Sequence, residues 1–201
     1  MAKSYGAVYH DIIKKKLPHY LYQHSLGVAQ SGQELAYLYG EDPVKAYQSG
    51  LLHDYAKSYS TQVLRNYAAQ QEISLDEISW KEPQLLHGPV GALLLREELK
   101  VEDPEILEAV YYHTTGAPGL GKLGKIIFLA DVIEEGRSYP GVEKLRRAAR
   151  EDLRAALIQA LDQTIKLVID RCNLLHPYSV AFRNELLDNS ISGVPYESNP
   201  F

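Results

Sequence analysis

The chain has 201 residues, of which 45% are hydrophobic, and it carries 26 acidic against 21 basic side chains. This length suffices for one domain with a substantial core, so we expect a single domain over residues 1–201 with its core over about 18–188. The slight acidity excludes the clustered Lys and Arg of a nucleic-acid-binding surface. A small-molecule partner is therefore expected.

Membrane and thiol chemistry are also disfavoured. The amino-terminal segment MAKSYGAVYH lacks a continuous apolar run, and no run elsewhere approaches the roughly 18 residues that span a bilayer. We expect a cytoplasmic protein without a membrane partner. The single cysteine, Cys172, cannot form an internal disulfide or a thiol-rich metal site, so a metal would have to be bound by His, Asp or Glu.

Hydrophobic residues recur at helical spacing along most of the chain, without strand-like alternation, which predicts an all-α fold. Proline and Asp-Pro pairs mark helix starts, because aspartate caps a helix and proline suits its first position. Gly40 suits a left-handed helix end. In chain order, the predicted helices cover residues 18–40, 43–54, 61–70, 89–100, 104–113, 123–135, 141–172 and 177–183.

Two internal stretches break this pattern. Residues 71–83 are more polar and are expected at the surface. Residues 114–121 contain three glycines and one proline, which predicts a loop whose N–H groups could approach a phosphate, although it matches no established phosphate-binding motif. Residues 193–201 are expected to form a loose tail, and His10 and His19 are expected at the surface.

Six His and Asp residues stand in the order H…HD…H…H…D, each within or beside an apolar segment: His24, His53, Asp54, His87, His113 and Asp131. If packing brings these segments together, four imidazoles and two carboxylates converge. That mixture suits a divalent transition metal. A carboxylate buried in an apolar segment is costly unless it is paired or bound to a metal, which favours a ligand role for the two aspartates.

Each residue taken alone has a simpler explanation. His24 could be a hydrogen-bonded, partly buried histidine, and Asp131 could form an ion pair with Lys125 or Arg137. His87 and His113 could be ordinary cap or loop histidines. The ordered set of six favours one shared site over these separate explanations.

The segments around the six residues resemble the YqeK branch of the HD-domain phosphohydrolase superfamily. The similar segments read GLLHDYAK at 50–57, HGPVGA at 87–92, YHTTG at 112–116 and ADVIE at 130–134, and the likeness runs from about residue 18 to 183. The resemblance implies a helical HD-domain bundle around a central metal site. It also implies symmetrical hydrolysis of diadenosine tetraphosphate to two ADP, with iron or a similar metal.

The resemblance further implies roles for individual residues. It implies metal ligation by His24, His53, Asp54 and Asp131. It implies contacts to the nucleotide from the surrounding positions, which are Lys57, His87, His113, Thr114, Asp131 and Arg137, with His176 and Tyr178 as further contacts. This chain departs from the branch at Leu21, where an arginine is common, and at 134–136, which read Glu-Glu-Gly. The departures predict a different pocket rim.

The chemistry of phosphoanhydride hydrolysis accounts for such a set. A metal lowers the pKa of bound water from about 16 to about 7, and Lys57 and Arg137 would offset the charge of the polyphosphate. Asp54, Lys57 and His113 are therefore the candidate catalytic residues. His113 or His87 would protonate the leaving oxygen if charged near neutral pH, or both would complete a second metal site; the sequence leaves both arrangements open.

Alternatives to this function also stay open. One is a phosphohydrolase acting on a mononucleotide or a guanosine alarmone. Another is a nucleotide-binding sensor with little turnover, because a fold alone does not guarantee activity. The 15 tyrosines, against 3 phenylalanines, are compatible with a homodimer interface and equally with amphipathic helix faces.

Overall fold

The computed structural model describes residues 2–71 and 75–188, and within these ranges it contains helices and no strand. The all-α prediction is confirmed. The helices are α1 (Ala2–Lys16), α2 (His19–Tyr39), α3 (Pro43–Leu52), α4 (Thr61–Gln70), α5 (Glu77–Lys81), α6 (His87–Leu99), α7 (Pro104–Tyr112), α8 (Lys122–Ile133), α9 (Val142–Glu151), α10 (Leu153–Asp170) and α11 (Pro177–Leu187), with short 3-10 helices η1 (Tyr55–Ser58) and η2 (Pro83–Leu85).

The predicted capping signals act as expected. The Asp42 side chain accepts hydrogen bonds from the backbone N–H groups of Val44 and Lys45 at the start of α3, and Asp103 accepts one at the start of α7. Each bond satisfies a donor that the first helical turn leaves unpaired. Gly40 ends α2 in the left-handed conformation, at φ 65°.

Three features differ from the prediction. Helix α1 was not expected, yet it contributes Ile13 to the core, and Leu17 directly after it is also buried there. The long helix predicted over 141–172 is two helices, because Asp152 adopts an extended conformation and its side chain caps Ala155 N at 3.0 Å. The polar stretch 71–83 contains α5 and η2. Residues 72–74 and the predicted tail at 193–201 lie outside the described residues.

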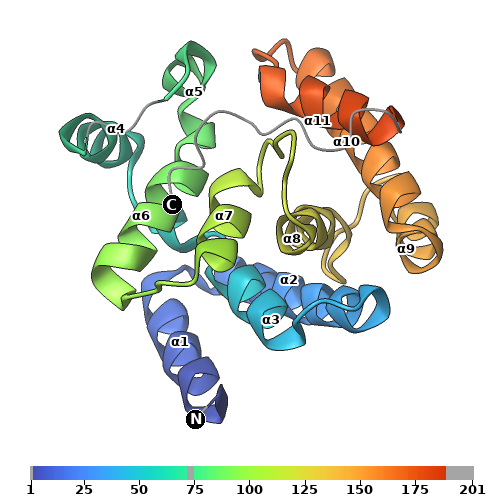
Figure 1. The fold of residues 1–201 in the computed structure, drawn as a ribbon. Coiled ribbons are helices and arrows are strands. Elements are labelled where there is room, and N and C mark those ends of the chain that lie inside the picture. Colours follow the sequence, from blue (N-terminus) through green and yellow to red (C-terminus); the bar gives the residue numbers. More distant parts are fainter. Residues whose placement is uncertain (1, 72–74, 189–201) are drawn as a thin grey trace.

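Helix α8 lies near the centre of the bundle (Figure 1). Helices α2, α3 and α7 pack against it on one side, and α9 and α10 pack on the other. Its side chains Ile126, Ile127 and Leu129 are fully buried, which accounts for a sequence that is apolar on nearly every face. No helix in the described ranges is long and apolar enough to cross a membrane.

Helices α2 and α3 approach each other closely at Gly50. A Cβ atom added there would lie 2.7 Å from both Cα and N of Ala29 on α2, closer than packed atoms can approach. This contact holds α2 and α3 together just ahead of the His53-Asp54 pair. The glycine therefore helps to set the separation of His24 and His53.

We expect Gly50→Ala to lower the free energy of unfolding by about 3 kcal/mol, because the added methyl group overpacks a helix contact made of backbone atoms. Urea denaturation measures this loss. Gly40→Ala is the matched control: no atom lies within 4 Å of its added Cβ, and only the strained φ remains, for a cost of about 1 kcal/mol. Equal losses in the two variants would contradict the close-packing explanation.

Candidate metal centre

The structure brings all six predicted His and Asp residues into one cluster. They come from five segments: His24 from α2, His53 and Asp54 from the end of α3, His87 from the first residue of α6, His113 from the end of α7 and Asp131 from α8. The placement of His53 and His113 at helix ends agrees with the prediction. Asp54 is fully buried and contacts both halves of the cluster: its Oδ2 lies 3.3 Å from His53 Nε2, and its Oδ1 lies 3.4 Å from His87 Nε2.

Three of the imidazoles are oriented in the same way. Each ring places Nδ1 against the carbonyl oxygen three residues earlier: His53 on Gly50 at 2.7 Å, His87 on Gln84 at 2.5 Å and His113 on Val110 at 2.7 Å. A carbonyl only accepts, so Nδ1 must carry the proton. In a neutral ring the inward-facing Nε2 then presents a lone pair, as a metal ligand does.

Several of the inward-facing atoms have no hydrogen-bond donor facing their lone pairs. Among the described residues, His53 Nε2 and both carboxylate oxygens of Asp54 are buried without a hydrogen bond. His87 Nε2 and His113 Nε2 lie 2.9 Å apart, although both present lone pairs when neutral. Such atoms are costly to bury unsatisfied. A cation at the centre of the cluster would satisfy these atoms.

The ionisation of the carboxyl groups and imidazoles also suits a bound cation. Burial alone would raise the pKa of Asp54 and of Asp131, but neighbouring histidines hold the pKa of each carboxyl below its usual range, and Arg137 lowers the pKa of Asp131 further. Burial, together with the neighbouring His113, lowers the pKa of His87 to about 3. Burial also lowers the pKa of His113. At neutral pH the two carboxylates are ionised and these two rings are neutral.

The spacing of the donor atoms fits a bound ion. Donors about 2.1 Å from one metal lie about 3 Å apart when at right angles and farther apart at wider angles. His24 Nε2 lies 2.9 Å from Asp131 Oδ1 and 3.8 Å from Asp54 Oδ2, and His53 Nε2 lies 3.9 Å from Asp131 Oδ1. The set of imidazoles and carboxylates suits a divalent transition metal.

Two cationic side chains stand beside the cluster. Lys57 Nζ lies 2.9 Å from Asp54 Oδ2, and the Arg137 guanidinium donates to the carboxylate and the backbone carbonyl of Asp131. Both side chains are about one-third exposed, at 34% and 39%. Together with His24 they line an open pocket of about 610 Å³. An anionic ligand that enters this pocket meets two positive charges beside the cluster.

Two residues that support the site were not predicted. Glu134 is buried, and its Oε1 lies 3.2 Å from His24 Nδ1, which orients that ring. Arg146 on α9 donates to the carbonyl oxygens of Ile133, Glu134, Glu135 and Arg137 and so holds the segment after α8. A carboxylate three residues after Asp131 was an available signal for Glu134. Arg146 gives no such local signal.

Two of the predicted nucleotide contacts, His176 and Thr114, lie in different surroundings. His176 is engaged at both ring nitrogens, since Nε2 lies 2.8 Å from Asp76 Oδ2 and Nδ1 accepts from the backbone N–H of Tyr178. This pairing links α11 to the segment before α5. Thr114, in contrast, lies in the cluster, with Oγ1 3.1 Å from His113 Nε2. His176 remains only a predicted nucleotide contact.

The glycine-rich loop and His10 also differ from expectation. The N–H groups of the three loop glycines already donate within the protein: Gly116 to Tyr112, Gly119 to Glu185 and Gly121 to Glu108. They are not free to bind a phosphate. His10 is half-buried, with Nε2 2.6 Å from the Tyr47 hydroxyl, so its prediction as a surface residue was wrong, whereas His19 is exposed.

A metal bound in this cluster should stabilise the fold. At a free metal concentration 1,000 times Kd, the free energy of unfolding should rise by about 4 kcal/mol, which corresponds to a Tm increase of about 10 °C for a chain of this size. Differential scanning calorimetry before and after treatment with a chelator measures this difference. Equal Tm values for protein of verified metal content and for stripped protein would contradict a metal at this position.

An all-helical fold around an ordered His and Asp cluster defines the HD-domain class of metal-dependent phosphohydrolases. The HD domain profile matches residues 21–167, and the chain belongs to this family. It is similar to proteins named bis(5'-nucleosyl)-tetraphosphatase, symmetrical. The relative from Halalkalibacterium halodurans is 40% identical, covering 88% of this chain and 94% of the relative, and that from Bacillus subtilis is 35% identical, covering 89% and 95%.

A solved structure agrees with this family assignment. The protein from Clostridium acetobutylicum, described as a predicted HD superfamily hydrolase involved in NAD metabolism, aligns with a TM-score of 0.87. It is 38% identical, and the alignment covers 90% of this chain and 96% of that one. The predicted HD-domain fold is therefore confirmed along most of the chain.

Proposed function

We propose that this protein hydrolyses diadenosine tetraphosphate to two molecules of ADP. The observation that carries the proposal is the buried, electron-rich His and Asp cluster with Lys57 and Arg137 at its open side. Such a cluster holds a divalent metal, and the two cations suit a polyanionic substrate. The relatives named symmetrical bis(5'-nucleosyl)-tetraphosphatase support the choice of substrate.

His24, His53, Asp54 and Asp131 would hold one metal ion. We propose iron, which the His and carboxylate donor set accepts. Asp54 Oδ1, His87 and His113 offer a second set of donors. When bound, a metal supplies Lewis acidity, which lowers the pKa of water and polarises phosphoryl oxygens. The neutral state of His87 and His113 favours the second metal site over their alternative role as general acids.

The other residues act by binding and orienting the substrate. Lys57 and Arg137 neutralise charge on the phosphates, and the Thr114 hydroxyl donates to a phosphoryl oxygen near His113 and His87. The low pKa of Asp54 makes it a poor proton acceptor, so its catalytic role is to hold cations, including Lys57. In addition to its ligand role, Asp131 fixes the Arg137 guanidinium through the carboxylate and carbonyl contacts.

Hydrolysis adds one water across the central P–O–P bond. The water oxygen bonds to one inner phosphorus while the bond from that phosphorus to the central bridging oxygen breaks. The bridging oxygen leaves on the second half, which gives two ADP, and both water protons pass to solvent. A terminal phosphate has a second pKa near 6, so the leaving oxygen departs as an anion at neutral pH without a general acid. This chemistry is compatible with neutral His87 and His113. A nucleotide substrate also agrees with the cytoplasmic location that we propose.

Product analysis tests the assignment. Metal-quantified protein is incubated with diadenosine tetraphosphate, a mononucleoside triphosphate or a guanosine alarmone, and the products are separated by anion-exchange chromatography. We expect ADP as the sole product from diadenosine tetraphosphate, at a kcat/KM at least about tenfold above the other substrates. AMP plus ATP would overturn the cleavage position, and preference for another nucleotide, or binding without turnover, would overturn the substrate assignment.

A further inference from the structure

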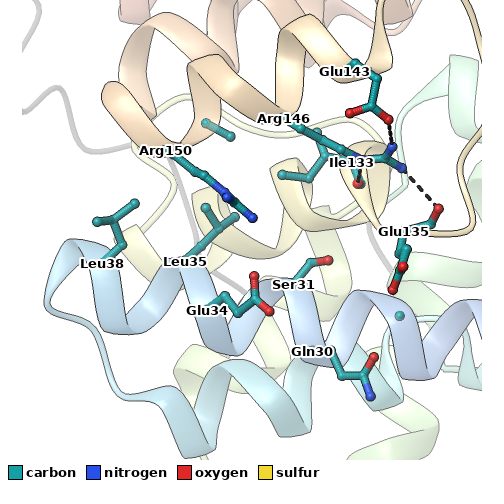
Figure 2. Close-up of a pocket in the computed structure, with 12 residues that line it drawn as sticks. Gln30, Ser31, Glu34, Leu35, Leu38, Ile133, Glu135, Glu143, Arg146 and Arg150 are labelled. Carbon is teal, nitrogen blue, oxygen red and sulfur yellow. Dashed lines mark hydrogen bonds and ion pairs between the residues drawn. The ribbon is translucent and has the colours of Figure 1, made fainter.

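A second pocket lies between α2 and α9, apart from the metal cluster (Figure 2). Its volume is about 840 Å³, and its lining mixes polar and apolar side chains, among them Ser31, Glu34 and Leu35 from α2 and Arg150 from α9. Arg146 also lines it, but this guanidinium is committed to the backbone carbonyls that follow α8. Nothing in the proposed chemistry so far uses this pocket.

The pocket continues the opening of the metal centre. Both are lined by Gly27, Gln30 and Glu135, so the two pockets adjoin along α2, and together they are called the groove. The same helix carries His24 at the metal cluster and Glu34 in the second pocket. At 1.5 Å per residue, these positions lie about 15 Å apart along the helix axis. An extended ligand that starts at the metal centre can follow the groove to Glu34.

The far end of the groove is suited to a nucleoside. Arg150 and Glu34 extend toward each other from opposite sides (Figure 2), yet neither forms an ion pair with any residue in the described ranges. A carboxylate accepts hydrogen bonds from a ribose diol, and a guanidinium stacks on a base. The acidic side chain disfavours a phosphate here, while Leu38, which lines the pocket and is 51% exposed, offers an apolar surface to a base.

We propose that this groove binds the nucleoside of one nucleoside diphosphate half of the substrate, with Glu34 on the ribose and Arg150 against the base. The attached phosphates then extend along α2 to Lys57, Arg137 and the metal centre. Anchoring the nucleoside at a fixed distance from the metal selects which phosphoanhydride is cleaved. The proposal rests on the proposed function and adds the determinant of central cleavage.

Titration calorimetry on the metal-containing protein tests the groove without turnover. The probes are ADP and pyrophosphate, which share two linked phosphates and differ in the nucleoside. In Arg150→Ala and in Glu34→Gln, we expect the Kd for ADP to rise about tenfold and the Kd for pyrophosphate to stay within twofold of wild type. Arg147→Ala, an exposed arginine on the same helix that does not line the pocket, should leave both unchanged.

Unchanged ADP affinity in Arg150→Ala and Glu34→Gln would overturn the groove assignment, as would equal losses for ADP and pyrophosphate. The products of diadenosine tetraphosphate provide a second readout. Wild-type protein should release ADP alone. Arg150→Ala should also release AMP and ATP, because the nucleoside no longer fixes which phosphoanhydride lies at the metal centre. Failure of wild-type turnover, with the ADP-specific loss retained, would overturn the proposed function and leave the nucleoside site standing.

Discussion

Asp54→Asn should lower kcat at least about 1,000-fold, which corresponds to about 4 kcal/mol of transition-state stabilisation, and should lower the bound metal content. Asparagine keeps the shape of aspartate but loses the charge that faces both halves of the cluster. Steady-state kinetics and elemental analysis of the purified variant measure the two effects. Both should fall together, because one carboxylate contacts His53, His87 and Lys57.

Stability separates this effect from misfolding. The substitution also removes the ion pair of Asp54 with Lys57, but Lys57 is one-third exposed and can turn to water, so the metal-free variant should keep a cooperative unfolding transition close to that of metal-free wild type. Asp11→Asn removes an equal charge from an exposed position on α1 and should leave activity unchanged. Wild-type metal content and turnover in Asp54→Asn would disprove the ligand assignment.

Arg137→Ala should lower kcat/KM for diadenosine tetraphosphate about 100-fold, or about 2.7 kcal/mol, mainly through a higher KM. The guanidinium is held by Asp131 and lies at the open side of the cluster, where the polyphosphate would enter. Arg137→Lys should recover part of the loss, because it keeps the charge but not the two-pronged donor geometry. Steady-state kinetics of wild type, Arg137→Ala and Arg137→Lys measure kcat and KM.

The control is again a change of equal charge elsewhere. Arg147→Ala removes an exposed arginine from α9 and should leave KM within twofold of wild type. Bound metal in Arg137→Ala should also remain, since the guanidinium pairs with Asp131 but supplies no lone pair. An unchanged KM in Arg137→Ala would show that this residue does not bind the substrate.

Features with local causes were predictable from the sequence. Asp42-Pro43 and Asp103-Pro104 start helices because cap and proline act on their own first turn. The six metal-site candidates were identifiable because they are polar residues in or beside apolar segments. When those segments pack together, the polar residues meet at one site. Helix α1 was missed because its amino-terminal half gives no cap or proline signal, although Ile13 joins the core.

Features that depend on tertiary geometry were not predictable. The continuing apolar periodicity after 141 masked the break at Asp152, whose cap is a single side chain. The contact of Glu134 with His24 joins residues 110 positions apart, and the bonds from Arg146 depend on how the chain leaves α8. His10 lies against Tyr47 for the same reason. A sequence pattern indicates which helix face such a residue occupies, but it does not indicate which distant residue will contact it in the folded protein.

The measurement that tests the central claim most directly is a metal titration. Chelator-stripped protein receives increasing iron or another divalent metal, and ADP release from diadenosine tetraphosphate is followed at each step. We expect no activity without metal, a rise that saturates at one or two equivalents in wild type, and activity at least about 1,000-fold lower in Asp54→Asn at every metal concentration. Full ADP release by stripped protein, or equal activation of Asp54→Asn, would contradict a catalytic metal centre at this cluster.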